Sequence, residues 1–411
     1  MTTTTTSDLS RRVRVLIGQV AVKLALFATF AGFVSVLLPA LVADIDPGGK
    51  VGTLAMITAI GFTLNAVAQP LVGALSDRTR SPLGRRLPWV VAGAIVGGLA
   101  IGAIGDADTV LTLTLLWALA QLALHGLEIA VDAYLVDAFA PARRGVAAGI
   151  TGLALVAGTA TGAAVSSTLV GRPSLASWLF AAMIGVSVIV FAVLVRDAPT
   201  TTAEVPRRRF ADTIRGAAAA AAAHPDFLKV LVWRVGYSIA YSSVFAYQLY
   251  ILTDLIGMPT GPAARTVAVA VGVGSLAAAL SVILGGWLSD RMRRRRVFIV
   301  VANAALIGGN LLLLVWPSVP TVIAMAVLFG IGLGLSISCG RALASQVLPD
   351  QRSGAAVGLG TLSTAANVGQ ALAPPVAALA IGIGGYPAVF LVSIAGSVIS
   401  WVAIAFVRSV R

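Results

Sequence analysis

Twelve long apolar stretches constrain what this chain can fold into. Each has about 20 residues or more, the length that a helix needs to cross the ~30 Å hydrocarbon core of a bilayer. Lipid offers no hydrogen-bond partners, so a spanning segment must be a helix or part of a closed barrel, and barrel strands would be short and alternating. The sequence therefore predicts an all-α membrane protein with spans near 15–42, 51–76, 88–105, 109–140, 144–170, 174–196, 226–254, 264–290, 296–315, 319–347, 354–380 and 386–408.

The distribution of charge predicts the orientation of these spans. Only 11% of the 411 residues are charged, against about a quarter in soluble domains. The net charge of +13 comes from arginines in alternate loops, so it does not indicate nucleic-acid binding. Of 29 Lys and Arg residues, 23 fall in loops on one side and three on the other, namely Lys50, Arg172 and Arg265. By the positive-inside rule, we expect a multi-pass inner-membrane protein with both termini cytoplasmic.

Two motifs recur in the second half of the chain. The stretch Gly73–Arg78 after the second span matches Gly286–Arg291 after the eighth, at a spacing of 213 residues. Residues 139–145 likewise match residues 348–354, at a spacing of 209 residues. The repeats predict two pseudo-symmetric six-helix bundles, an architecture typical of secondary transporters. We expect bundles at residues 1–196 and 226–411, joined by a basic cytoplasmic linker at 197–225.

Other classes of protein lack support in the sequence. The single cysteine, Cys339, excludes an internal disulfide. No metal-ligand cluster, nucleophile triad or phosphate-binding loop is recognisable, so we expect neither an enzyme nor a bound cofactor. A membrane sensor or scaffold would keep the same helices, but it would not need the loop motifs and buried charges together.

The stretch from Gln69 to Trp89, QPLVGALSDRTRSPLGRRLPW, carries a family resemblance. With its shorter repeat at 286–291, it resembles the signature of the major facilitator superfamily over the whole chain. The longer stretch is most similar to the glycoside–pentoside–hexuronide:cation symporters, and among them to the sucrose-transporter-like subgroup. The resemblance implies alternating access by the two bundles, with helices 1, 4, 7 and 10 around a central cavity.

In that family the loop after the second helix contributes to a cytoplasmic gate. A carboxylate just beyond a helix C-terminus is opposed by the helix dipole, so Asp77 needs cationic or amide partners. We assign the gate motif to Gly73, Asp77, Arg78, Arg85, Arg86, Gly286, Asp290 and Arg291. The alternative is that these arginines only satisfy the positive-inside rule.

The sequence departs from the family's known coupling schemes. Sodium-coupled sugar members carry two aspartates in the second helix, where this chain has Asn65 and Gln69. Many proton-coupled drug exporters carry an arginine in the fourth helix, where this chain has Leu122. Neither scheme is expected here.

Ionisable residues within the spans mark the predicted solute and proton pathway, because burying them is costly. On the fourth span, Gln121, His125, Glu128 and Asp132 are spaced by 4, 3 and 4 and share one helix face. The seventh span aligns aromatic and hydrogen-bonding groups that suit a sugar or another amphipathic solute; ordinary helix packing is the alternative. The full set is Lys23, Gln121, His125, Glu128, Asp132, Trp233, Arg234, Tyr237, Tyr241, Gln248 and Arg341.

Two hypotheses concern pairing among these residues. Asp132 is expected to form an ion pair between the halves with Arg341 or Arg234, or else a purely structural pair. Glu128 is the candidate proton carrier, and its protonation would compete with a contact to Lys23. His125 is a candidate to relay the proton or to bind solute, and the alternative is an ordinary hydrogen-bonded histidine. We expect a monomeric transporter in the lipid bilayer that takes up a small polar solute, such as a sugar or glycoside, together with protons. The alternative is a proton-antiport exporter of drugs or secondary metabolites.

Overall fold

All secondary structure in the described residues is helical. The computed structural model describes residues 6–82, 84–139, 141–195, 224–292, 294–347 and 355–407. Clustering of contacts divides the chain into two compact units. Unit 1 comprises Met1–Phe33 and Leu64–Arg207, and unit 2 comprises Val34–Thr63 and Arg208–Arg411. Residues 34–63 of the first repeat thus belong to the same unit as the second repeat.

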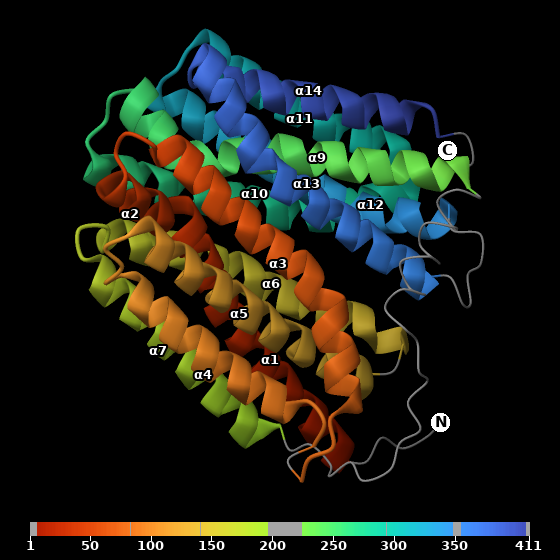
Figure 1. The fold of residues 1–411 in the computed structure, drawn as a ribbon. Helices are drawn as coiled ribbons and strands as arrows, with labels where there is room; N and C mark the ends of the chain where they lie inside the picture. Colours follow the sequence, from red (N-terminus) through yellow and green to blue (C-terminus); the bar gives the residue numbers. More distant parts are fainter. Residues whose placement is uncertain are drawn as a thin grey trace. The chain divides into compact units, whose positions relative to one another are not determined.

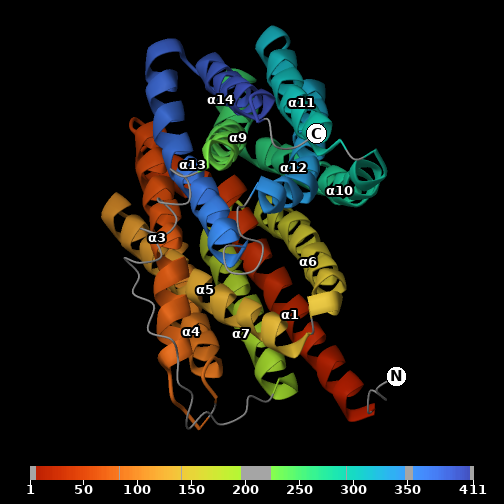
Figure 2. The ribbon, with the colours of Figure 1, turned by 90° about the vertical axis from the view of Figure 1, so that its right-hand side faces the viewer.

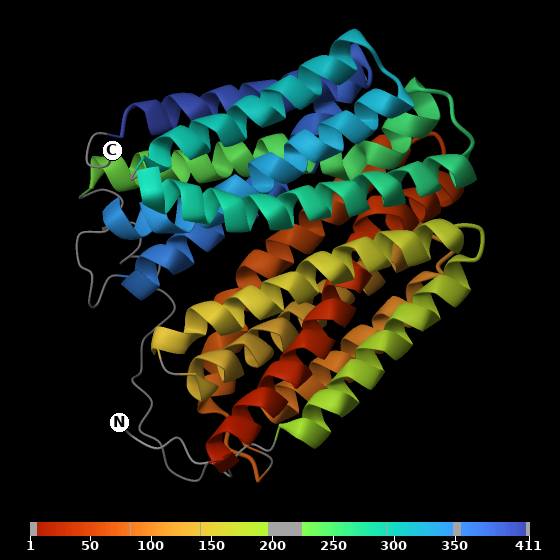
Figure 3. The ribbon, with the colours of Figure 1, turned by 180° about the vertical axis from the view of Figure 1, so that it is seen from behind.

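The helices of the first repeat begin with a long span interrupted by a π-helical turn. Its parts are α1, η1 and α2, and α1 lies against α6 and α7 (Figure 3). In unit 1, α4 packs along α5 (Figure 2). The bounds are α1 Thr6–Gly32, η1 Phe33–Leu37, α2 Leu38–Ile45, α3 Lys50–Arg78, α4 Leu87–Ile104, α5 Val110–Ala138, α6 Pro141–Thr168 and α7 Pro173–Leu194.

The second repeat follows the same plan, again with a π-helical turn at the end of its first helix. In unit 2, α9 packs on both α13 and α14, and α12 packs on α10 and α11 (Figure 1). The bounds are α9 Pro225–Tyr250, η2 Ile251–Leu255, α10 Thr260–Met292, α11 Arg295–Val315, α12 Val319–Val347, α13 Ala355–Gly384 and α14 Pro387–Ala405.

The predicted fold class is confirmed. Each of the twelve predicted spans coincides with a long helix, counting α1, η1 and α2 as one. Eleven of these segments are long and apolar enough to cross a membrane. The exception is α9, which carries Lys229, Arg234 and several tyrosines and is correspondingly less apolar. The predicted linker at 197–225 lies almost wholly outside the described residues.

Small residues bring the helix that carries Lys23 close to its neighbour. A Cβ atom on Gly162 of α6 would lie within hard-contact distance of the Ala28 carbonyl of α1, and one on Gly158 would lie 2.5 Å from the Leu24 carbonyl oxygen. Only glycine allows this approach of two backbones. Just beyond the end of α1, Phe33 packs against Trp117 of α5 and Phe180 of α7, with both pairs of ring centroids 5.8 Å apart. These contacts hold α1 in place beside α5.

Candidate solute and proton site

A buried ion cluster joins α1 and α5 within unit 1. Lys23 Nζ lies 2.8 Å from Glu128 Oε1 and 2.9 Å from Asp132. The predicted contact between Lys23 and Glu128 is therefore present. The side chains of Lys23 and Glu128 are 10% and 18% exposed, whereas that of Asp132 is 55% exposed. The pair with Glu128 is the more deeply buried, so water screens it less.

Helical spacing explains how the two helices meet along one seam. On α1, Gln19, Lys23, Phe27 and Phe30 follow one another at intervals of four, four and three residues. This interval keeps them on the face opposite His125, Glu128 and Asp132 of α5. Gln19 Nε2 donates to the carbonyl oxygen of Val131 at 2.9 Å, which sets the register of the seam.

His125 is held on two sides. Its Nδ1 lies 3.0 Å from Glu128 Oε2, and its ring stacks on Phe30 with centroids 4.5 Å apart and an interplanar angle of 19°. Glu128 therefore interacts with Lys23 through one carboxylate oxygen and with His125 through the other. Gln121, one turn further along α5, is buried at 5% exposure. The structure thus brings Lys23, His125, Glu128 and Asp132 together.

The predicted residues on α9 are arranged differently, within unit 2. Trp233 and Tyr237 are 0% and 2% exposed and face α12, where Gly340 leaves space for the indole and Gly332 lies beside the Tyr237 hydroxyl. Arg234 Nη1 donates to Ser336 Oγ at 3.4 Å. Trp233 and Tyr237 consequently belong to the packed interior of unit 2.

Further along α9, Tyr241 stacks on Phe245 with centroids 5.7 Å apart and also contacts Phe329 of α12. The side-chain oxygen of Gln248 is buried and has no hydrogen-bond partner within the described residues. The side chain of Arg341 lies outside them. The pairing of Asp132 with Arg341 or Arg234 therefore stays a prediction.

Part of the predicted gate motif is described. Arg86 is buried at 7% exposure, with its guanidinium 5.9 Å from the ring centroid of Tyr134. Gly84 has a φ of +88°, a conformation that side chains oppose, which explains why this loop needs glycine. Arg85 is half-buried, Gly286 lies near Ser338, and Arg291 sits over Trp287. The side-chain environments of Gly73, Asp77, Arg78 and Asp290 lie outside the described residues.

The sequence analysis missed a second ion cluster, which lies in unit 2. Lys50 Nζ is 2.7 Å from Asp254 Oδ2, and the Tyr386 hydroxyl donates to the same oxygen at 2.6 Å. Tyr250 lies beneath Lys50 and donates to the Pro39 carbonyl at 2.8 Å. The only available signal was that Lys50 is one of three cations on the sparsely charged side.

Asp254 and Tyr386 lie outside the candidate spans, and Lys50 is the first residue of one. Burial raises the pKa of Asp254, but hydrogen bonds from Lys50, Tyr386 and Thr253 outweigh it, so the pKa is lowered. Asp254 therefore stays ionised as the pH falls, and its contribution to the cluster is lost only when the pH passes below that lowered pKa.

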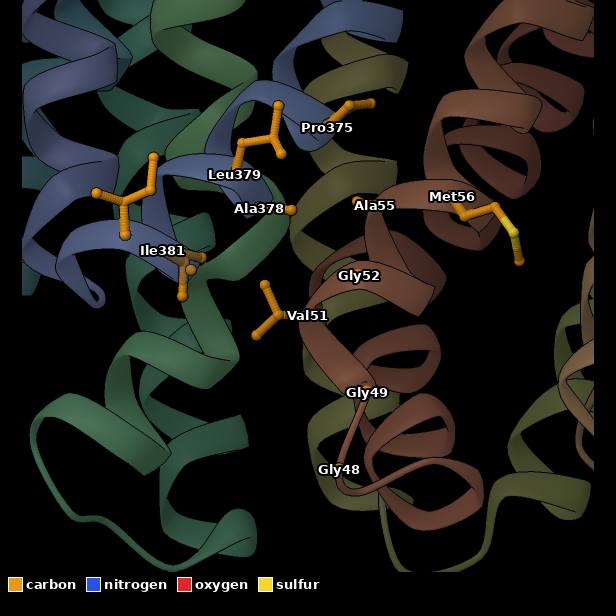
Figure 4. Close-up of a pocket in the computed structure, with 12 residues that line it drawn as sticks. Gly48, Gly49, Val51, Gly52, Ala55, Met56, Pro375, Ala378, Leu379 and Ile381 are labelled. Atoms are coloured by element: carbon orange, nitrogen blue, oxygen red, sulfur yellow. The ribbon is translucent and has the colours of Figure 1, made fainter.

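A groove of about 890 Å³ lies beside this cluster, between the start of α3 and the end of α13 (Figure 4). Its lining is small or apolar, with Val51 on one wall and Ile381 on the other. None of the predicted pathway residues lines it. Without polar groups it offers nothing to orient a polar solute, so it is not the candidate site.

With repeated helical motifs and with buried or half-buried ionisable side chains on α1, α5 and α9, the chain has the organisation of a secondary transporter. It belongs to the Major Facilitator Superfamily, whose model matches residues 21–266 and 235–411. It is a multi-pass membrane protein of a transporter family, not an enzyme.

Two transport proteins resemble parts of this chain in sequence. The chain is 32% identical over 287 residues to the probable nitrate/nitrite transporter NarK2 of Mycobacterium tuberculosis, covering 65% of this chain and 68% of that protein. A shorter stretch of 49 residues is 47% identical to an uncharacterised symporter of Synechocystis, covering 12% of this chain and 8% of that protein.

Solved structures show the same fold at low identity. The nucleoside transporter NupG has a TM-score of 0.75 at 13% identity, covering 94% of this chain and 99% of that one. A bacterial homologue of the human lysosomal transporter Spinster has a TM-score of 0.71 at 16% identity, covering 96% of each chain. The glycoside–pentoside–hexuronide resemblance is not among these matches and continues to rest on residues 69–89.

Proposed function

We propose that this protein moves a small polar solute by alternating access and couples that movement to protons at the α1–α5 cluster. The observation that carries the proposal is the balance of charge in that cluster. Lys23 faces two carboxylates, Glu128 and Asp132, and His125 contacts Glu128. With His125 neutral, these four side chains carry one net negative charge, and one added proton makes them neutral. A buried group of this kind favours taking up a single proton.

The geometry supports a route for coupling. Glu128 uses one oxygen for Lys23 and the other for His125, so a proton arriving at His125 or Glu128 changes the strength of both contacts. Lys23 lies on α1 and Glu128 on α5, so protonation alters how firmly two helices are joined. A solute that binds where these helices meet would favour one state over the other, which is the requirement for coupling.

The Lys50–Asp254–Tyr386 cluster supports the alternating-access part of the proposal. It ties the start of α3, from the first repeat, to elements of the second repeat. Tyr247 adds to it, since its hydroxyl lies 3.0 Å from the Val51 carbonyl and 3.1 Å from that of Pro374. A transporter must break such ties to open the side of the membrane on which they lie. By the positive-inside rule, that is the outer side.

An Asp254→Asn variant is expected to weaken this outer tie. Asparagine keeps the shape but removes the charge that holds Lys50, so residues at the start of α3 should become accessible more often. Replacing Cys339 by serine and buried Ala55 by cysteine provides a probe. Its labelling by a membrane-impermeant maleimide should be about fivefold faster in the variant, as expected for the loss of ~1 kcal/mol from a partly exposed pair.

The Asp108→Asn variant is the control, because Asp108 is an exposed carboxylate in unit 1, whereas the cluster belongs to unit 2. Equal labelling rates in the Asp254→Asn protein and in the parent would show that the tie does not restrict access.

Two observations bear on the substrate class, and they favour different solutes. The stretch 69–89 resembles sugar and glycoside symporters, and we propose uptake of such a solute with protons. The nitrate/nitrite relative and the half-buried Arg234, hydrogen-bonded to Ser336, favour a small anion as the second candidate. Proton-antiport export of drugs or secondary metabolites is the third outcome to be tested.

Transport into proteoliposomes separates these candidates. Sugars, glycosides, nitrate, nitrite, organic anions and cationic dyes would each be tested with an inward, an outward and no proton gradient. Symport of a sugar predicts accumulation only with the inward gradient, and antiport predicts it only with the outward one. Transport of every substrate at rates independent of pH gradient would refute proton coupling.

A further inference from the structure

An apolar groove of about 580 Å³ runs along the surface of unit 2 between α9, α13 and α14. Its floor is bare backbone, because a Cβ on Gly236 would lie 2.8 Å from the Gly396 carbonyl oxygen and one on Gly396 would lie 2.9 Å from that of Gly236. Its walls are partly exposed aliphatic side chains, including Leu228 at 49% and Ile399 at 55%. The three helices that form it are neighbours in Figure 1.

The length of the groove matches one membrane leaflet. On α9 its lining extends from Leu228 to Ile239. Eleven residues of helix rise about 16 Å, close to half of the ~30 Å hydrocarbon core. No charged side chain lines it, so a polar solute would find no partner there. An aliphatic chain would fill it.

A basic cluster lies at the end of the groove marked by Leu228. Lys229, the next residue, contacts Asp226 at 2.7 Å and donates to the Phe406 carbonyl at 2.8 Å. Arg296 Nη2 donates to the adjacent Ala405 carbonyl at 2.5 Å. Both cations thus converge on the C-terminal end of α14, where the helix dipole is negative.

Arg294 and Arg295 precede Arg296 at the start of α11, and Arg294 is exposed. The carboxylate of Asp226 contacts Lys229, so Lys229 and the three arginines set four positive charges against it. The cluster therefore has an excess of positive charge at the level of lipid headgroups, on the side of the membrane to which the arginine-rich loops belong.

We propose that this groove binds one anionic phospholipid, with an acyl chain along Gly236 and Gly396 and the phosphate at Lys229 and Arg294–Arg296. Basic pockets beside transmembrane helices recognise anionic headgroups, and each Lys or Arg near the surface contributes to the attraction. The apolar lining suits an acyl chain, and the length of the groove matches one leaflet. The basic residues at its end suit a negatively charged headgroup. The proposal does not depend on the transported solute.

The test is native mass spectrometry of the purified full-length protein with added phosphatidylglycerol or phosphatidylcholine. The parent protein should retain phosphatidylglycerol in preference to phosphatidylcholine. In the double variant Arg294→Gln/Arg296→Gln, the ratio of bound phosphatidylglycerol to bound phosphatidylcholine should decrease about fivefold for each charge removed. Arg172→Gln, an exposed arginine outside unit 2, is the charge control and should change nothing.

The acyl site is tested by filling the groove. Ala395→Trp places an indole in the groove and should abolish retention of both lipids, and Ala395→Leu serves if the tryptophan variant does not fold. Val398→Trp, on the same helix but outside the lining, is the size control. Retention of lipid by a folded Ala395 variant, or no headgroup preference in the parent, would overturn the proposal. So would a concentration-dependent dimer that Ala395→Trp abolishes, because the groove would then be a subunit interface.

Discussion

A Glu128→Gln variant is expected to lose proton-driven accumulation of solute while retaining exchange of solute across the membrane. Glutamine preserves the size of the side chain and can still accept a hydrogen bond, but it cannot take up a proton. Coupling between two sites typically changes an affinity by a factor of about 5 to 150. The ratio of solute inside to solute outside should therefore decrease by a factor of that size. The measurement is uptake into proteoliposomes with and without an imposed pH gradient, alongside counterflow at equal pH.

The control for this experiment is Asp106→Asn, which removes an exposed carboxylate from the loop before α5. It should accumulate solute as the parent protein does. Accumulation by the Glu128→Gln variant at the parent's level would show that the proton binds elsewhere. Loss of exchange as well would instead indicate that Glu128 holds the solute or the fold.

Among the variants proposed for this protein, Lys23→Met is expected to lower the free energy of unfolding the most. Methionine fills a similar volume, but it leaves Glu128 and Asp132 without their shared cation. Breaking one member of a buried ion pair typically costs about 3–5 kcal/mol. The pair with Glu128 should account for most of this, because the Asp132 side chain is 55% exposed and its interaction is screened. The purified variant should therefore unfold at a distinctly lower temperature in the same detergent.

A double-mutant cycle separates this interaction from a general loss of packing. In the Glu128→Gln background, Lys23→Met should be much less destabilising, because the more deeply buried carboxylate that faces Lys23 is already absent. Arg172→Met, which removes an exposed cation at the start of α7, should shift the unfolding temperature little. Additive effects of Lys23→Met and Glu128→Gln would contradict an energetic link between the two side chains.

The sequence contains enough information to predict the helices and one face of the candidate site. Every span must satisfy its own backbone in lipid, so apolar length alone locates twelve helices. The spacing of His125, Glu128 and Asp132 predicts a shared face because helical periodicity is local. The contact of Glu128 with Lys23 could be predicted since a buried carboxylate needs a cation and few are available.

Other contacts could not be predicted, because they join residues far apart in the sequence without any periodic pattern. Lys50 meets Asp254 across 204 residues, and Asp254 meets Tyr386 across 132. The stacking of Phe30 on His125 depends on how α1 and α5 are rotated about their axes, which the Gln19–Val131 hydrogen bond and the glycines of α6 determine. Aromatic residues such as Trp233 attract a binding interpretation from their type alone, yet in the fold they fill the interior of unit 2.

The π-helical turn at Phe33–Leu37 gives the first span a weakness that a regular helix would lack. It falls where the chain passes from unit 1 into unit 2. Such turns hold one residue more than an α-helical turn, so the surplus can move along the helix or be removed. Deleting Ser35 would remove the surplus residue and leave a plain α-helix, in which Lys23 keeps its position around the axis relative to Leu38–Ile45. The ion cluster should therefore survive the deletion, whereas the weak turn is lost. A single-residue deletion would in this way separate the geometry of the ion cluster from bending of the first span.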